Sequence, residues 1–392
     1  MKNKNRMITV LGLMAFLANG DNYAAAPLLI NISKDLNLTI SAAALSVTAY
    51  MLAFGVFTLL FGPLSDRYGK VKIINIAALG TAIFSILGTF AFNLPSLIFF
   101  RAMNGAFGAG IFPVTIAFIG QSFEAKNRHK AIASLMGLMF LGAATATAIG
   151  GFLSYFGSWR MVYMTYGISE LIVAIIMLKM LERDTPQNTT LHLIKAYKDP
   201  FTNFNFLRLV ITIFFVGFCV FGTFTYSGKL LKEITGYNIL AVGLILSLFG
   251  VGTVVGSKIA PKLKPKLKHG FLVLAGLIGL ISLLTLSITQ NVWILSIGLI
   301  GFGLAFIFLQ STLVSTAQEM LPKARGTAMS LASFNMFVGG AVGTSFNGYL
   351  IKTYPVSTIF RNASIIILIV SIIAAFFVTR FENHAKNSNQ LG

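Results

Sequence analysis

The chain has 392 residues, of which 56% are hydrophobic and only 10% are charged, against roughly 25% charged residues in soluble domains. This composition excludes an ordinary soluble domain. The formal net charge of +19 would suggest nucleic-acid binding in a soluble protein, so its meaning here depends on where the basic residues fall.

Apolar segments of about 20 residues recur along the chain, and each is long enough to cross a hydrocarbon core of about 30 Å as a helix. We predict an all-α membrane protein. The first segment is too long to be a cleavable signal peptide. The twelve expected transmembrane spans are 7–31, 40–61, 72–92, 96–118, 132–154, 161–181, 206–228, 238–257, 270–288, 292–316, 328–351 and 357–379.

Lys and Arg residues are distributed unequally between alternate loops. Counted loop by loop, 23 fall on one side and 6 on the other, and Arg101 remains inside a helix. The positive-inside rule therefore predicts that both termini face the cytoplasm in a multi-pass protein of the cell membrane. We expect the basic residues to contact anionic lipid headgroups and expect no nucleic-acid partner.

An internal repeat divides the chain into halves. The pattern Lys-x-Arg-x-x-Ala begins at Lys126 and returns at Lys323, and Met-Phe-x-Gly begins at Met139 and returns at Met336, both at an offset of 197 residues. Parallel repeats of this kind place a substrate site near the membrane midplane between two bundles. We predict two pseudo-symmetric six-helix bundles, over 1–181 and 206–392, joined by a cytoplasmic linker over 182–205.

A short charged turn separates the second and third apolar segments. It reads Gly-Pro-Leu-Ser-Asp-Arg-Tyr-Gly-Lys over residues 62–70, which resembles the loop that marks the major facilitator superfamily. The resemblance implies the major facilitator fold and a gating role for the turn. The residues that carry this expectation are Gly62, Asp66, Arg67, Gly69 and Lys70.

Two further patterns indicate a branch of that family. Leu97-x-x-x-Arg101-x-x-Asn104-Gly105 is similar to the family's fourth-helix pattern, with Asn in place of Gln. Gly142-x-x-x-Ala146-Thr147-x-x-Gly150-Gly151 resembles the antiporter pattern but lacks its central Gly-Pro. With Pro27-Leu28-Leu29-Ile30 and Thr225-Tyr226, these patterns resemble the twelve-helix drug/proton antiporters of arabinose-efflux and bicyclomycin type.

Ionisable residues at bilayer depth are costly and therefore functional candidates. Asp21 lies within Asn-Gly-Asp-Asn in the first segment, Arg101 enters the fourth from the outer side, and Glu170 lies at similar depth in the sixth. We expect Asp21 to carry a proton and to be able to pair with Arg101. The resemblance places the helix of Glu170 on the outer scaffold of its half, which makes Glu170 the weaker coupling candidate.

Other candidates line a cavity or pack helices together. Glycines on a membrane helix allow close approach between backbones, and we expect such faces to let the halves slide. The cavity candidates are Asn19, Asn22, Tyr23, Asn104, Phe218 and Tyr226, and the packing candidates are Gly142, Gly150, Gly151, Gly339 and Gly343.

Enzymatic chemistry has little support in this sequence. Cys219 is the single cysteine, and we expect no catalytic site, metal or cofactor. The prediction is a monomeric, proton-coupled exporter of small organic molecules that works by alternating access. The alternatives are a uniporter or symporter for a sugar, nucleoside or osmolyte, favoured by the missing Gly-Pro, and a receptor or scaffold that moves no solute.

Overall fold

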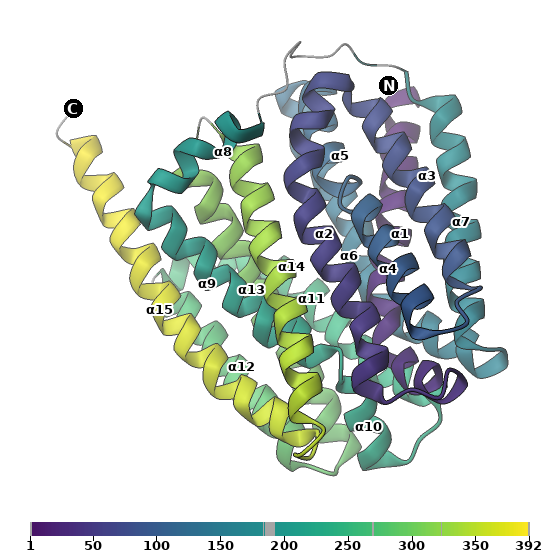
Figure 1. Ribbon diagram of the computed structural model, residues 1–392. Coiled ribbons are helices and arrows are strands. Elements are labelled where there is room, and N and C mark those ends of the chain that lie inside the picture. Colours follow the sequence, from purple (N-terminus) through teal and green to yellow (C-terminus); the bar gives the residue numbers. More distant parts are fainter. Residues whose placement is uncertain (1, 183, 185–192, 269, 323, 391–392) are drawn as a thin grey trace.

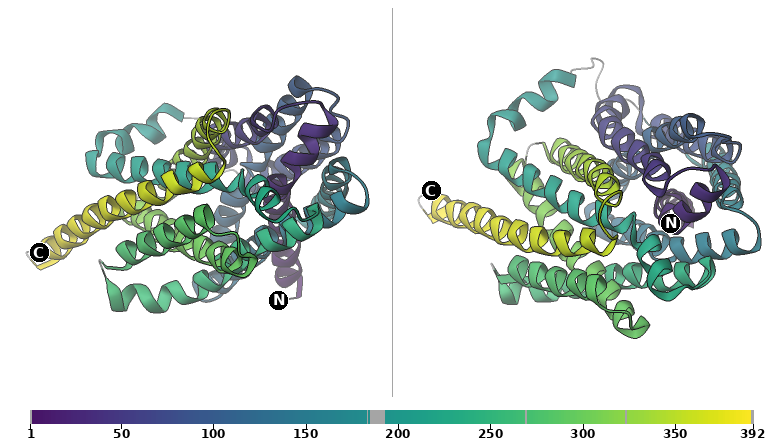
Figure 2. Two further views of the ribbon diagram at one scale, coloured as in Figure 1. Left: turned by 90° about the horizontal axis from the view of Figure 1, so that it is seen from below. Right: turned by 60° about the horizontal axis from the view of Figure 1, so that its bottom comes forward.

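The computed structural model describes residues 2–182, 184, 193–268, 270–322 and 324–390, and within these ranges the chain is almost entirely helical (Figure 1). The predicted linker falls partly outside these ranges. Two long groups of helices lie side by side, α1 to α7 in one and α9 to α15 in the other (Figures 1 and 2). The helices are α1 (Lys2–Asp35), α2 (Ile40–Tyr68), α3 (Lys70–Gly88), α4 (Leu94–Gly108), α5 (Phe112–Ser122), α6 (Ala125–Phe156), α7 (Trp159–Met180), α8 (Leu193–Thr202), α9 (Phe204–Phe224), α10 (Ser227–Thr235), α11 (Ile239–Leu267), α12 (Gly270–Ile288), α13 (Val292–Met320), α14 (Arg325–Leu350) and α15 (Ser357–Gln390).

Among the described residues, ten helical stretches are long and apolar enough to cross a membrane. Two of them contain an irregular turn, because α4 with α5 and α9 with α10 each form one stretch. The long helices α1 and α14 run beside these spans but fall outside this set. The class of fold is therefore confirmed, whereas the count of twelve stays a prediction.

Within the described ranges, short polar residues cap the start of six helices. Thr39 caps α2, Asn93 forms a capping box at α4, and Ser158 caps α7. Asn side chains cap α9, α11 and α13 in the same way. Each cap satisfies a backbone N–H that the helix leaves free, so the polar loop residues fix where the apolar helices start.

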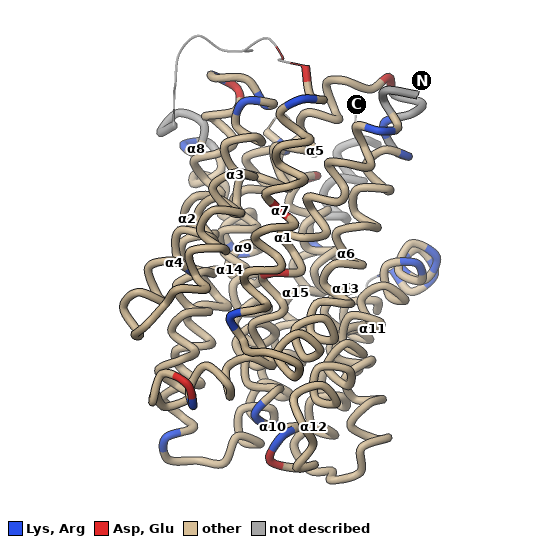
Figure 3. Tube along the Cα trace, turned by 90° about the vertical axis from the view of Figure 1, so that its right-hand side faces the viewer, with Lys and Arg blue, Asp and Glu red and all other residues tan. Residues whose placement is uncertain are grey.

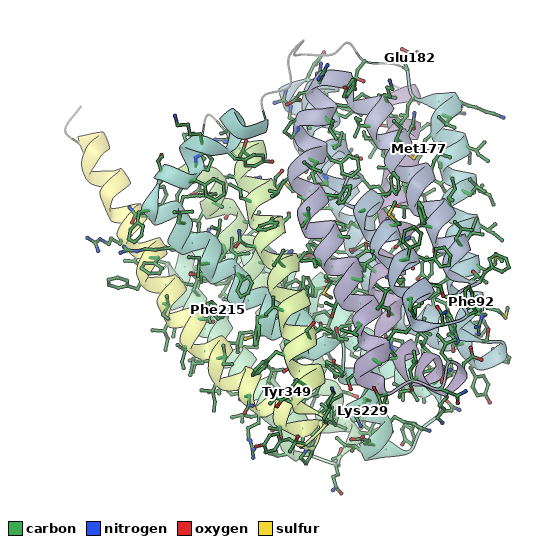
Figure 4. All side chains as sticks on the ribbon, viewed as in Figure 1. Phe92, Met177, Glu182, Phe215, Lys229 and Tyr349 are labelled. Carbon is green, nitrogen blue, oxygen red and sulfur yellow. The ribbon has the colours of Figure 1, made fainter. Side chains whose placement is uncertain are left out.

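Large apolar side chains cover much of the outer surface, while charged residues gather toward the two ends of the bundle (Figure 3). Phe92 and Phe215 point outward, whereas Met177 is enclosed, and Lys229 and Tyr349 lie at the end opposite Glu182 (Figure 4). Exposed apolar area of this extent suits contact with lipid rather than water.

The sequence repeat has a counterpart in the packing. Helix α6 packs on α1 and across the groups on α11, and the repeated helix α14 packs on α9 and across the groups on α2. A Cβ on Gly142 would lie 2.2 Å from the Phe16 carbonyl oxygen of α1, and one on Gly339 would lie 2.0 Å from that of Phe214 on α9. Equivalent glycines thus make equivalent close contacts.

Four of the five packing candidates pack within a group rather than between groups. Gly142 and Gly150 of α6 meet α1, and Gly339 and Gly343 of α14 meet α9. Gly151 alone of the five reaches across, to Ile239 and Gly243 of α11. A face on which the groups slide therefore stays a prediction for Gly151, whereas the other four glycines lie at contacts within a group.

Candidate functional site

A cavity of about 440 Å³ lies between the two groups of helices. Its walls run from mid-helix toward the end that carries the N-terminus, where α6 and α14 begin. None of the described lining residues is charged. Aromatic residues dominate one part of the wall, namely Tyr23, Tyr50, Phe54, Phe221, Phe249, Phe306 and Phe337, and polar residues another, namely Asn19, Asn22, Gln310, Ser311, Ser315, Gln318 and Ser333.

The aromatic part joins residues from both groups. The Tyr23 ring of α1 lies 6.1 Å from that of Phe221 and 6.0 Å from that of Phe224, both on α9, and 6.5 Å from that of Phe249 on α11. The lining rings of Phe54 on α2 and Phe337 on α14 stack on each other with centroids 4.0 Å apart. The cavity is therefore a shared surface whose shape changes if the groups move.

The opposite end of the bundle is closed by close backbone contact. A Cβ on Gly151 would lie 2.7 Å from the Ile239 carbonyl oxygen, and one on Gly243 would lie 2.3 Å from that of Thr147. Thr48 Oγ1 of α2 and Ser345 Oγ of α14 lie 3.2 Å apart at the same end. The two groups are thus in direct contact at the end of the bundle away from the N-terminus.

Three of the six predicted cavity residues line the cavity: Asn19, Asn22 and Tyr23. The other three do not line the cavity, because their side chains make contacts with other helices. Asn104 donates through Nδ2 to the Thr81 carbonyl at 3.0 Å, the Phe218 ring packs 5.7 Å from that of Phe346, and the Tyr226 hydroxyl donates to the Thr344 carbonyl at 2.8 Å. On α9, Phe221 rather than Phe218 faces the cavity.

Asp21 and Arg101 form a buried ion pair behind the cavity wall. Arg101 Nη1 lies 3.1 Å from Asp21 Oδ1, and the side chains are 2% and 1% exposed. The same nitrogen donates to Asn104 Oδ1 at 3.2 Å. The predicted pairing of Asp21 on α1 with Arg101 on α4 is present, but Asp21 lies inside the bundle rather than on the cavity surface.

Three tyrosines surround this pair, and sequence reasoning assigned none of them to it. The Arg101 guanidinium lies 4.6 Å from the centroid of the Tyr50 ring and 5.0 Å from that of Tyr163. Tyr166 packs on Gly20, where a Cβ would come within 2.7 Å of its ring. Tyr50 also lines the cavity, so it connects the ion pair to any bound molecule.

Glu170 is fully buried near the same pair, on helix α7, which packs on α1, α3 and α6 of its own group and contributes no residue to the cavity lining. It interacts electrostatically with both Asp21 and Arg101. The spacing of Tyr163, Tyr166 and Glu170 along α7 places them on one helix face. This spacing is the feature of the sequence that could have indicated that the three side chains lie together.

The charged turn between α2 and α3 is held by two carboxylates, Asp66 and Asp184. Asp66 pairs with Lys70 of its own turn at 3.3 Å. The N-terminus of α3 is bound instead by Asp184, which accepts from the Lys70 and Val71 backbone nitrogens at 2.8 and 2.9 Å. Gly69 has a φ of 93°, a conformation that favours glycine, and a Cβ there would lie 3.1 Å from Asp184 Oδ1.

The remaining turn residues lie around this contact. Arg67 stacks on the neighbouring Tyr68 ring at 5.0 Å, and Gly62 faces Ser330 of α14. The turn therefore lies where α2 meets the other group, at the end that carries the N-terminus.

A bundle of apolar helices around a central cavity, with an ion pair buried beside it, defines a membrane transporter. The sequence matches the Major Facilitator Superfamily over residues 11–344. The chain belongs to this family, and its family members are transporters rather than enzymes.

Similar proteins include several bacterial transporters. The chain is 24% identical to the uncharacterized MFS-type transporter YceJ of Bacillus subtilis, covering 89% of this chain and 90% of the relative. It is 25% identical to multidrug resistance protein D of Escherichia coli, covering 90% and 91%. It therefore resembles the drug-efflux branch of the family.

Solved structures share the fold. The nucleoside transporter NupG aligns with a TM-score of 0.76 at 13% identity, over 95% of this chain and 99% of that one. An inward-facing bacterial homologue of the human lysosomal transporter Spinster aligns with a TM-score of 0.72 at 17% identity, over 96% of each chain.

Proposed function

We propose that this protein exports small organic molecules in exchange for protons by alternating access. The observation that carries the proposal is the pairing of an uncharged, aromatic-lined cavity with a buried charged cluster directly behind it. A cavity of this volume suits a drug-sized organic molecule. Buried ionisable residues in a membrane transporter are the usual elements of a proton relay.

The Lys and Arg bias supports an orientation with the N-terminal side in the cytoplasm. On this basis the described conformation is the one that takes up substrate from inside the cell. The two halves, 1–181 and 206–392, would rock about the cavity as a monomer, with the turn at Gly62, Asp66, Arg67, Gly69 and Lys70 as part of the gate.

Coupling is assigned to Asp21, Arg101 and Glu170. Tyr50 links them to the cavity, since its ring contacts the Arg101 guanidinium and lines the substrate space. A molecule that moves Tyr50 changes the surroundings of the charged cluster, and a change in protonation moves Tyr50 in return.

Facilitated transport of a nucleoside or sugar is the second candidate. The fold similarity to NupG and the replacement of the antiporter Gly-Pro by Ala146-Thr147 favour it. The aromatic lining and the similarity to multidrug resistance protein D favour export of less polar molecules.

Reconstituted vesicles distinguish these functions. Ethidium, rhodamine 6G, uridine and glucose would be offered with and without a pH gradient that is acid in the lumen. We expect the dyes to accumulate in the lumen only with the gradient and nigericin to abolish their accumulation. Uridine or glucose uptake that ignores the gradient would favour the second candidate, and no movement of any compound would favour a receptor or scaffold.

A further inference from the structure

Glu170 is a buried acid whose oxygens have no partner. Its side chain is fully enclosed, and neither Oε1 nor Oε2 makes a hydrogen bond to any described residue. An ionised carboxylate in this situation costs several kcal/mol, so such a group takes up a proton instead.

The neighbouring ion pair is already balanced without Glu170. Arg101 contributes one positive charge and Asp21 one negative charge, and their nitrogen and oxygen meet at 3.1 Å. A second carboxylate would leave the cluster with an uncompensated negative charge beside Asp21. Like charges at close range disfavour ionisation of both.

The pair nevertheless keeps unused bonding capacity. Arg101 Nε has no acceptor and Asp21 Oδ2 has no donor among the described residues. The guanidinium therefore bonds Asp21, interacts electrostatically with Glu170, and retains one donor that no described residue uses. Its planar shape allows it to bind carboxylates through more than one nitrogen.

We propose that Glu170 holds the transported proton in this conformation, while Asp21 remains the charged partner of Arg101. When Glu170 loses the proton, its O–H bond breaks, the proton leaves to solvent, and the new carboxylate accepts from Arg101 Nε. No electron transfer is involved. This assignment rests on the proton-coupled function proposed above and differs from the expectation that Asp21 is the carrier.

The groups that interact with Glu170 come from four helices. They are Tyr166 on its own helix, Asp21 on α1, Tyr50 on α2 and Arg101 on α4. Helices α3 and α6 also pack on α7, and the charges acting on Glu170 from the described residues are those of Asp21 and Arg101. Because Tyr50 contacts both Arg101 and the cavity, a shift of Arg101 toward Glu170 would be felt by a bound molecule.

Infrared spectroscopy of the purified protein tests the assignment without a ligand. A protonated carboxylic acid has a C=O stretching band separate from that of carboxylates, and exposed acids are ionised at neutral pH. We expect this band in the wild type, its loss in Glu170→Gln, and its retention in Glu182→Gln, a control at an exposed acid just beyond α7. A band that persists in Glu170→Gln, or its absence from the wild type, would overturn the proposal.

Transport separates this assignment from the broader function. With a gradient of one pH unit, we expect ethidium accumulation in Glu170→Gln vesicles to fall by up to about tenfold, the full effect of one coupled proton, while ethidium exchange without a gradient continues. Melting temperature and size-exclusion profile would check that the variant folds. If the wild type ignores the gradient, the proposed function fails; if both proteins respond equally, only the role of Glu170 fails.

Discussion

Arg101 organises the buried polar cluster at the scale of single residues. Its guanidinium bonds Asp21 and Asn104 and stacks against Tyr50 and Tyr163. A buried cation is tolerated only when its charge is balanced by a partner. The stability of the N-terminal group therefore depends on which carboxyl group pairs with Arg101.

Removing both acids should cost more than the sum of the single changes. In Asp21→Asn, Glu170 can ionise and pair with Arg101, so we expect a small loss of stability. In Asp21→Asn with Glu170→Gln, the guanidinium stays buried without a counter-ion, which costs about 3–5 kcal/mol. Denaturation of the two single variants and the double variant in detergent measures this coupling, and a double variant whose loss of stability does not exceed the sum of the two single losses would contradict it.

A second ion pair lies at the end opposite the cavity opening and is open to solvent. Asp35 accepts from Arg160 and, at 3.1 Å, from Trp159 Nε1, while Arg160 also donates to the Ala91 carbonyl at 2.9 Å. The hydrogen bond from Arg160 holds the pKa of Asp35 below its ordinary value of 3.8. Its side chain is 45% exposed, so screening limits the pair to about 1 kcal/mol or less.

The pH dependence of this contact follows from the direction of the shift. Because the folded-state pKa is lowered, the stabilisation is present above pH 3.8 and is lost as the pH falls through the folded-state value. We expect Asp35→Asn to melt slightly below the wild type at pH 7 and the difference to vanish in strong acid. A difference that is constant across the pH range would show that the charge of Asp35 is not its source.

At the scale of elements, two polar contacts position helices at the end that carries the N-terminus. Asp184 binds the first backbone nitrogens of α3, and the Tyr197 hydroxyl of α8 donates to the Leu59 carbonyl of α2 at 2.7 Å. Burial raises the pKa of Tyr197 to about 12, so its hydroxyl stays a donor at neutral pH. Both residues lie in or near the linker between the groups.

Loss of the Asp184 cap should destabilise α3 and the turn before it. Removing a side-chain cap of this kind costs about 0.5–2 kcal/mol, and the carboxylate also complements the positive end of the helix dipole. We expect Asp184→Ala to lower the melting temperature and slow turnover, with Glu182→Ala as the exposed control. Equal behaviour of the two variants would rule out a capping contribution.

At the scale of the whole molecule, the end opposite the N-terminus is closed by contact between α6 and α11. Gly151 and Gly243 face each other so closely that a Cβ on Gly243 would lie 2.9 Å from the Gly151 Cα. Backbone atoms cannot move aside for an added Cβ as the end of a flexible side chain can. This contact is therefore compatible with one arrangement of the groups and is lost when that end opens.

A single methyl group at this contact should shift the conformational balance. Gly243→Ala places its Cβ against the Thr147 carbonyl at 2.3 Å, so we expect the arrangement open at that end to gain population. Spin labels at Phe156→Cys and Tyr237→Cys, exposed positions where α6 ends and just before α11 begins, would report a longer distance. Cys219 is buried and would not interfere.

Gly120→Ala is the matched control for this experiment, because a Cβ on Gly120 of α5 meets no atom within 4 Å. It should leave the distance unchanged. An unchanged distance in Gly243→Ala as well would show that the contact does not limit opening.

The membrane class, the family and most helix positions could be predicted from the sequence. Apolar length and the turn over residues 62–70 are local properties of the chain, and an apolar segment of sufficient length has few alternatives in a bilayer. The same local signals placed Asp21 and Arg101 at bilayer depth, and the expectation that they could pair is confirmed by the structure.

Only the tertiary structure decided which polar groups meet and which face the cavity. The side chains of Asn104 and Tyr226 donate to backbone carbonyls of other helices. Asp184 binds the N-terminus of α3, 114 positions earlier in the chain. Glu170 lies near an ion pair whose two residues belong to two other helices. Such contacts depend on how helices rotate about their axes when they pack. That rotation is set by the summed fit of many side chains and glycines across the bundle, which no single stretch of sequence contains.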